Sequence, residues 1–269
     1  MGSIEHAGRI EAYCGSPPSP GALTERWNLD PILIAALVLA LAAYGLASRS
    51  WRRGEQTPTM AQSACVCMGW AIGALALTSP LCALSVSLSA ARVAQHMVLA
   101  AVAAPLLALG LPRRRRLRPL EPLAAAAAFA VVLWFWHAPG PYDATFASPL
   151  TYWAMHLSAF GAAVWLWSTL LAAGARRLGE ALAAALLTSL QMGLLGAILT
   201  FANRPLYAPH ALTTAAWGLT PLGDQQLAGA IMWIPAGLVL AAAVVGGLAV
   251  ALRDAGRRAD SLAPVELAR

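Results

Sequence analysis

The sequence predicts an all-α polytopic membrane protein, a bundle of seven transmembrane helices with its N-terminus outside and its C-terminus in the cytoplasm. Hydrophobic residues make up 59% of the chain and charged residues 11%, too apolar a composition for a soluble globular domain. Apolar segments close to the ~20 residues that cross a bilayer recur along the chain. The basic residues are all arginine and gather in short clusters, a pattern typical of topology control, so we expect no nucleic-acid partner.

The chain is expected to have three regions. Residues 1–29 are polar and turn-rich and lack the n-region, apolar run and cleavage site of a signal peptide. We expect a disordered periplasmic tail there, with His6 and Cys14 solvated. Residues 30–252 should form one transmembrane domain, and residues 253–269 a cytoplasmic tail.

Seven apolar segments make up the expected transmembrane domain. They cover residues 31–47, 62–81, 87–111, 120–137, 150–173, 180–202 and 225–252. Small residues within them favour close helix approach in lipid; the clearest are Gly69 with Gly73, Gly193 with Gly196, and Gly246 with Gly247.

Arginine sets the expected orientation. Clusters follow the first, third, fifth and seventh segments, whereas the alternate loops carry only Arg92 and Arg204. The positive-inside rule then places the N-terminus outside and the C-terminus in the cytoplasm, as in a multi-pass protein of the bacterial inner (plasma) membrane. The run of arginines within 113–118 could bind anionic lipid or a partner, but we favour a topology signal.

Polar residues within the expected membrane region lie in its outer half. His96 and His156 fall roughly six residues inside their helices, about 9 Å below the outer boundary. Imidazole and thioether groups together suit a soft ion such as Cu(I), so the sequence permits a copper site between the third, fifth and seventh segments. The candidate metal ligands are His96, His156, His137, Met97, Met155, Met232 and Asp224.

Several of these polar residues also have an ordinary structural interpretation. A membrane histidine often bonds a neighbouring helix, and the tryptophans before His137 are typical of an interfacial belt. His210, in a loop, is a weaker candidate ligand, and we expect Gln191 to join helices and Met192 to pack. By default, Arg92 should extend to the interface.

Two acidic residues could pair with Arg92 if it does not reach the interface. These are Asp224 and Asp143, at the outer ends of neighbouring segments.

The cysteines favour packing roles. Cys65 and Cys67 could bind Cu(I) or Zn(II) as thiolates, but residues two apart on a helix point about 200° from each other. Cys82 lies near the outer face and could pair only with Cys14, and we expect no disulfide there.

No enzyme motif is present. The sequence lacks a phosphate-binding loop, a His-Glu-x-x-His zinc motif, a Cys-x-x-Cys-His haem attachment and a nucleophile elbow. We therefore expect no enzymatic activity. Two histidines on separate helices could ligate a haem axially, which is the sharpest alternative to copper.

Four blocks from the third to the seventh segment stand out together. They are Gln95-His96-Met97 through Ala104-Pro105-Leu106-Leu107, Leu133-Trp134-Phe135-Trp136-His137, Met155-His156-Leu157-Ser158, and Asp224-Gln225-Gln226-Leu227-Ala228-Gly229 with Met232-Trp233. This chain resembles the CtaG family of cytochrome c oxidase assembly factors, the multi-helix membrane type. The resemblance implies an assembly role in supplying or stabilising copper. It implies a haem–copper oxidase subunit and a periplasmic copper chaperone as partners, within membrane lipid.

The chain departs from the family pattern at two positions. Family members often carry a further histidine four residues before those that match His96 and His156, whereas this sequence has Arg92 and Tyr152 there. A His-x-x-x-His pair is therefore missing from both helices, which leaves methionines, Asp224 or His137 to complete coordination.

The leading hypothesis is an assembly factor that binds Cu(I) on its periplasmic side. His96 and His156 would be the main ligands; Met97, Met155, Met232 and His137 would be secondary, and Asp224 would orient a ligand or neutralise Arg92. The alternatives are a copper transport or resistance protein, a metal-free membrane scaffold, and a haem-binding protein. Metal content separates the scaffold from a carrier, and metal flux separates a transporter from both.

Overall fold

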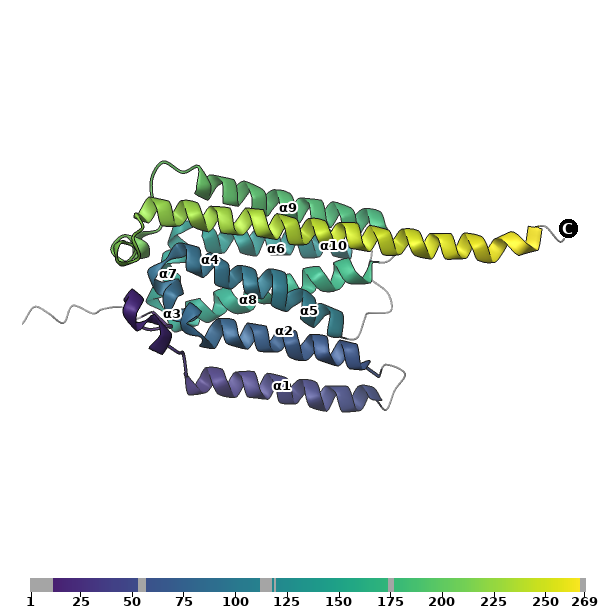
Figure 1. The fold of residues 1–269 in the computed structure, drawn as a ribbon, viewed down its shortest axis with the longest axis horizontal. Helices are drawn as coiled ribbons and strands as arrows, with labels where there is room; N and C mark the ends of the chain where they lie inside the picture. The colour runs from purple at the N-terminus through teal and green to yellow at the C-terminus, as the bar shows by residue number, and fades with distance from the viewer. Residues whose placement is uncertain (1–11, 53–56, 112–117, 119, 174–176, 267–269) are drawn as a thin grey trace, which may run out of the picture.

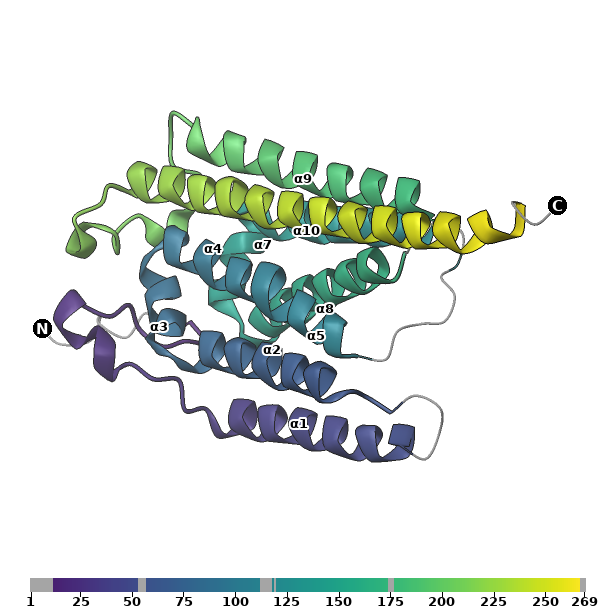
Figure 2. The ribbon, with the colours of Figure 1, turned by 45° about the vertical axis from the view of Figure 1, so that its right-hand side comes forward.

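The computed structural model describes residues 12–52, 57–111, 118, 120–173 and 177–266. Within them the long helices lie side by side in one bundle (Figures 1 and 2). The helices are α1 (Pro31–Arg52), α2 (Met60–Thr78), α3 (Pro80–Ser87), α4 (Ser89–Met97), the π-helix η2 (Val98–Ala103), α5 (Ala104–Gly110), α6 (Glu121–His137), α7 (Pro139–Ala147), α8 (Pro149–Ala172), α9 (Leu178–Thr200) and α10 (Pro221–Glu266), with short 3₁₀ turns η1 (Pro20–Glu25), η4 (Ala208–His210) and η5 (Ala215–Trp217).

The helices identify a multi-pass membrane protein. Among the described residues, five helices are long and apolar enough to cross a membrane, or six when α6 and α7, bent by 71°, count as one broken span. Each apolar segment predicted from the sequence coincides with helical structure, although α10 continues past the predicted end at Leu252 to Glu266. Figures 1 and 2 show this last part of α10 extending beyond the other helices.

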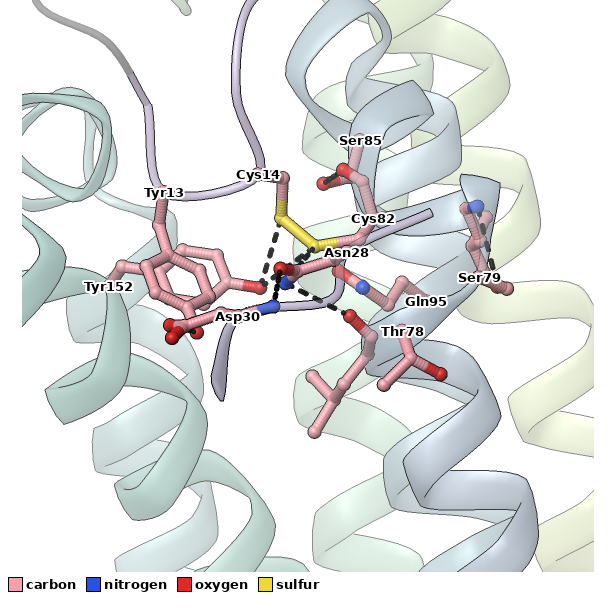
Figure 3. Close-up of a disulfide and its surroundings, with 12 residues drawn as sticks. Tyr13, Cys14, Asn28, Asp30, Thr78, Ser79, Cys82, Ser85, Gln95 and Tyr152 are labelled. Carbon is pink, nitrogen blue, oxygen red and sulfur yellow. Dashed lines mark hydrogen bonds between the residues drawn. A yellow bond between two sulfur atoms is a disulfide. The ribbon is translucent and has the colours of Figure 1, made fainter. Parts of the chain in front are cut away.

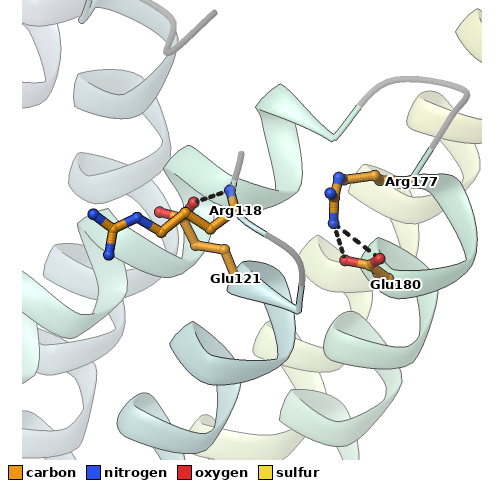
Figure 4. A network of polar contacts seen from close by, with 4 residues as sticks. All are labelled: Arg118, Glu121, Arg177 and Glu180. Carbon is orange, nitrogen blue, oxygen red and sulfur yellow. Dashed lines mark hydrogen bonds and ion pairs between the residues drawn. The ribbon is translucent and has the colours of Figure 1, made fainter. Parts of the chain in front are cut away.

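The two ends of the bundle differ. One end, here called the disulfide end, holds α3, α7 and the loop between α9 and α10 (Figure 1). The other, the arginine end, holds the junctions before α6 and α9. Figure 4 shows Arg118 and Arg177 there. The Arg118 amide donates to Glu121 at 2.8 Å, and Arg177 pairs with Glu180 at 2.9 Å. The arginine run at 113–116 lies outside the described residues.

Two short helices at the disulfide end, α3 and α7, replace what the sequence predicted as the end of a span or a loop. Each begins with a proline, Pro80 or Pro139. Proline is favoured in the first helical turn because an amide there has no acceptor within the helix, so the lack of an N–H costs no hydrogen bond. The Ser79 hydroxyl also caps α3 by accepting from the Leu81 amide at 3.4 Å. A serine or a proline at the start of a short apolar run was therefore the sequence signal that could have predicted these two helices.

The predicted helix 87–111 contains a widened turn. Its α-helical geometry ends at Met97, continues as the π-helical segment η2 and resumes as α5, which has Pro105 in its first turn. Proline cannot donate to the preceding turn, and π segments form where that ladder is interrupted. The Trp167 indole of α8 donates to the Ala100 carbonyl at 2.8 Å. The irregular turn begins two residues after His96.

Residues 12–30, here called the N-terminal strap, are ordered, so our prediction of a disordered tail is wrong for this part. The prediction that Cys14 and Cys82 stay unpaired is also wrong, because they form a disulfide across 68 residues. Figure 3 shows the disulfide beside Tyr152, whose hydroxyl lies 3.4 Å from Cys14 Sγ and 3.7 Å from Cys82 Sγ. Tyr13 stacks on Tyr152 at 4.7 Å between ring centroids and donates to Asp30. Residues 1–11, with His6, lie outside the described residues.

Small residues bring the helices close, as expected for helices packed in lipid. A Cβ added to Gly69 of α2 would lie 2.8 Å from the Ala103 carbonyl oxygen. A Cβ added to Gly196 of α9 would lie 2.7 Å from the Trp233 Cβ of α10. Gly193, Gly246 and Gly247 face open space, so only part of the predicted glycine packing is confirmed.

Candidate functional site

Histidines from three helices line one small cavity in the half of the bundle nearer the disulfide end. Its volume is about 40 Å³, and its lining includes His96 of α4, His137 of α6 and His156 of α8. A cavity needs roughly 10–15 Å³ to hold one water molecule, so this one has room for a water or a single ion. Met97 and Met155 also line it. The remaining lining is apolar or aromatic: Leu99, Ala100, Phe129, Val132, Leu133, Trp136, Ala159 and Phe160.

The third and fifth predicted segments are therefore neighbours, as the copper hypothesis requires. The His96 and His156 rings lie 5.0 Å apart between centroids and cross at 73°. Tyr152, one turn before His156, packs its ring 4.1 Å from the His156 ring. The sequence predicted that the seventh segment, now α10, would complete the site. The cavity is instead completed by α6, which contributes His137.

Backbone carbonyls orient two of the three imidazoles. His156 Nδ1 lies 3.0 Å from the Tyr152 carbonyl oxygen, and His137 Nδ1 lies 2.8 Å from that of Leu133. A carbonyl can only accept, so Nδ1 must carry the proton on each ring, which leaves Nε2 with its lone pair. This arrangement is common in histidines that bind metals, where the second nitrogen fixes the ring.

Two ring nitrogens at the cavity have no partner. The Nε2 atoms of His96 and His156 are buried, and neither atom forms a hydrogen bond within the described structure. An unsatisfied buried polar atom costs about 1–3 kcal/mol. Among the described residues, however, no group of three His, Cys, Asp or Glu side chains is arranged to hold a metal ion. Any ion here would depend on imidazole and thioether donors.

Arg92 lies next to this cavity and does not extend to the interface as predicted. Its side chain is 2% exposed. The guanidinium donates to Thr145 Oγ1 and, at 3.6 Å, to Met155 Sδ. It lies 4.3 Å from the Phe146 ring centroid and 5.1 Å from that of Tyr142. No carboxylate in the described part of the chain forms an ion pair with it, so the expected pairing with Asp224 or Asp143 is also wrong.

Asp224 caps a helix and has no contact with the cavity. Its carboxylate is fully buried and accepts from the Ser89 amide and hydroxyl, each at 2.7 Å, and from the Ala90 amide at 3.1 Å. A carboxylate at a helix N-terminus satisfies free amides and interacts favourably with the helix dipole. The carboxylate of α10 thus fixes the start of α4, the helix that carries His96.

Met232 and His210 lie away from the cavity. Met232 is fully buried in the main apolar core. His210 is buried in the loop after α9, with its Nε2 atom 2.8 Å from the Tyr142 hydroxyl oxygen. Burial away from water lowers the pKa of His210 to about 4, so this loop histidine is neutral near pH 7.

The predicted structural roles of Gln191 and Met192 are confirmed, and those of the two cysteines of α2 are confirmed in part. Gln191 joins helices as predicted, because its side-chain oxygen accepts from the Trp134 indole at 2.7 Å, and Met192 packs in the core. Cys65 and Cys67 are unpaired, but Cys67 is exposed on the bundle and does not pack.

Arg92 and Tyr152 are the site residues that sequence reasoning undervalued. Each stands four residues before a cavity histidine, and residues four apart lie on one helix face. Their helical spacing was the signal that placed them beside His96 and His156. The spacing alone could not show that both side chains are buried in the bundle.

Comparison with known proteins gives one match. The model of a family described as cytochrome c oxidase caa3 assembly factor (Caa3_CtaG) matches residues 42–254, a stretch that contains every residue of the cavity. No curated protein matches, and no solved structure matches.

Proposed function

This chain belongs to the family of cytochrome c oxidase caa3 assembly factors, and we propose that it holds Cu(I) in the histidine cavity during assembly of a haem–copper oxidase. In this proposal the copper is cargo. It is supplied to, or stabilised in, an oxidase subunit, and a periplasmic copper chaperone delivers it. The protein acts in a bacterial inner (plasma) membrane.

One observation carries the proposal: two buried Nε2 atoms that have no partner among the described residues, on rings 5.0 Å apart, share a cavity with two thioethers. For His156 the Nε2 atom holds a lone pair, because Nδ1 donates to a carbonyl. Imidazole nitrogen and thioether sulfur are donors that suit Cu(I). The mostly apolar lining supports a soft, singly charged ion over a hard, strongly hydrated one.

The ligand roles follow from the lining. His96 and His156 are the main ligands, and Met97, Met155 and His137 are secondary ones. Met232 and Asp224 have no ligand role, since Met232 lies in the apolar core and Asp224 caps α4.

We infer that the cargo lies near the outer surface. In the seven-crossing topology that the sequence predicts, the positive-inside rule puts the arginine end, with Arg118 and Arg177, in the cytoplasm. The disulfide end then faces the periplasm, an oxidising compartment in which a disulfide such as Cys14–Cys82 persists.

A transporter has less support. Toward the arginine end the buried interior consists largely of small and apolar side chains, including Ala104, Ala108, Ala125, Ala163 and Leu166. Met68 and Cys67, which could extend a path of soft ligands, are exposed on the bundle surface. A metal-free scaffold is the second candidate, and it is favoured by the lack of a three-residue His, Cys, Asp or Glu cluster in the described structure.

Cu(I) titration of the purified protein in detergent, under anaerobic conditions, tests the proposal. We expect about one equivalent of Cu(I) in the wild type and none in a His96→Ala/His156→Ala double variant. His210→Ala is the matched control, because it removes a buried histidine that has no contact with the cavity. This control should keep the copper.

Thermal melting in the same detergent establishes that each variant is folded. A folded wild type that takes up no Cu(I) would overturn the carrier proposal in favour of the metal-free scaffold. Copper retained by the folded double variant would place the ion elsewhere.

A further inference from the structure

We propose that Arg92 makes the histidine cavity selective for singly charged over doubly charged metal ions. The inference rests on the proposed function, because it assigns Arg92 a role in a cavity that holds Cu(I). Arg92 acts by its charge, from the wall of the site, and is not itself a ligand.

The position of the charge is fixed by two contacts. Arg92 lies four residues before His96, on the same face of α4. Its Nη2 atom is 3.6 Å from the sulfur of Met155, and Met155 lines the cavity. The guanidinium is therefore one side chain away from the space that an ion would occupy.

This charge has no counter-ion in the described structure. Its neighbours are neutral: Thr145 accepts a hydrogen bond, and the rings of Phe146, Tyr142 and Tyr152 lie 4.3, 5.1 and 6.0 Å from the guanidinium carbon. The Asp224 carboxylate accepts from the amides that start α4 and, in the described structure, forms no ion pair with Arg92. Aromatic rings stabilise a cation, but they do not cancel its field as a carboxylate would.

A buried, uncompensated charge discriminates between ions in proportion to their charge. Coulomb repulsion of an ion of charge +2 is twice that of an ion of charge +1 at the same place. Because free energies enter binding constants exponentially, the penalty factor for the divalent ion is the square of that for the monovalent ion. At roughly 8 Å and an effective dielectric constant of about 20, the factor is about thirtyfold for a monovalent ion and about a thousandfold for a divalent one.

This selectivity matters because the histidine ligands do not by themselves exclude divalent ions. Imidazoles bind Zn(II) and Cu(II) readily, so histidine ligands alone would not reserve the cavity for Cu(I). Arg92 disfavours both divalent ions and leaves the monovalent ion as the cargo that fits.

The test compares Ag(I), a redox-stable monovalent probe, with Zn(II), both titrated into detergent-purified protein. Removing the charge in Arg92→Gln should tighten Ag(I) binding at least tenfold and tighten Zn(II) binding by about the square of that factor. Arg92→Lys keeps the charge and should keep the wild-type preference. Thr145→Asp provides a second route, because it places a carboxylate where Arg92 already donates and should shift the preference as Arg92→Gln does.

The outcomes separate the two proposals. A wild type that binds neither Cu(I) nor Ag(I) overturns the proposed function and this inference together. If the wild type binds Ag(I) but Arg92→Gln and Thr145→Asp change Ag(I) and Zn(II) affinity by equal factors, the inference fails and the copper-holding function stands. Should Arg92→Gln not fold, Thr145→Asp with its native Arg92 decides the result.

Discussion

The two halves of the bundle handle buried polar groups in different ways. Toward the arginine end, the buried hydroxyls of Thr169 and Thr188 donate to carbonyls of their own helices, at 2.8 and 2.9 Å. Toward the disulfide end, Asp224, Arg92 and Gln95 reach across to other elements. In the first half these two hydroxyls are satisfied within their own helices, and the Trp167 indole makes one bond across helices, to the Ala100 carbonyl. The second half depends on contacts between helices and leaves some polar atoms unpaired.

This difference is consistent with the proposed site in the disulfide-end half. Small and apolar side chains fill much of one half. Among the described residues, the other half combines the Arg92 guanidinium, which forms no ion pair, with the unpaired ring nitrogens of His96 and His156. Buried ionisable groups in a membrane are costly and mark functional sites. We therefore expect stability and function to separate along the bundle in this way.

The largest expected effect comes from the disulfide. Cys14→Ser/Cys82→Ser should lower the free energy of unfolding by up to about 4 kcal/mol, because the disulfide closes a 68-residue loop and limits the unfolded chain. Thermal melting in detergent measures the loss. Cys65→Ser/Cys67→Ser, at the start of α2 toward the arginine end, is the matched control and should change stability by less than about 1 kcal/mol.

Equal melting temperatures for both double variants would contradict this prediction. They would indicate that the N-terminal strap is held by its other contacts, such as the stacking of Tyr13 on Tyr152.

A smaller effect should appear on acidification. Burial lowers the pKa of His210 to about 4, from a usual value of about 6.5. The unfolded chain therefore takes up this proton first, and the folded state loses stability as pH falls from about 6.5 towards 4, by roughly 3 kcal/mol in total. Above pH 6.5 the contribution is complete.

His210→Gln should remove this part of the pH dependence, which is checked by comparing melting temperatures of variant and wild type between pH 7.5 and 4.5. Parallel curves would show that another group controls the acid sensitivity of the disulfide end.

The sequence predicted the long helices because apolar length is a strong signal. It also predicted the two histidines at the cavity, from their depth and from the methionines beside them. The short helices α3 and α7 were missed because their eight and nine residues carry no spanning pattern, and only proline and serine mark their starts.

Long-range contacts account for the other errors. Nothing local shows that Asp224 caps a helix 135 residues earlier in the chain or that Cys14 reaches Cys82. Arg92 was expected at the interface because an isolated arginine in lipid would extend there. The aromatic rings and Thr145 that retain it come from α7 and α8, and their approach depends on tertiary packing.

X-ray absorption at the copper edge of the Cu(I)-loaded protein tests the central claim most directly. We predict imidazole nitrogen neighbours with their characteristic outer-shell scattering, together with at least one sulfur neighbour, and loss of this spectrum in His96→Ala/His156→Ala. A Cu(I) spectrum without imidazole scattering, or one unchanged in the double variant, would contradict the claim that the histidine cavity holds the metal.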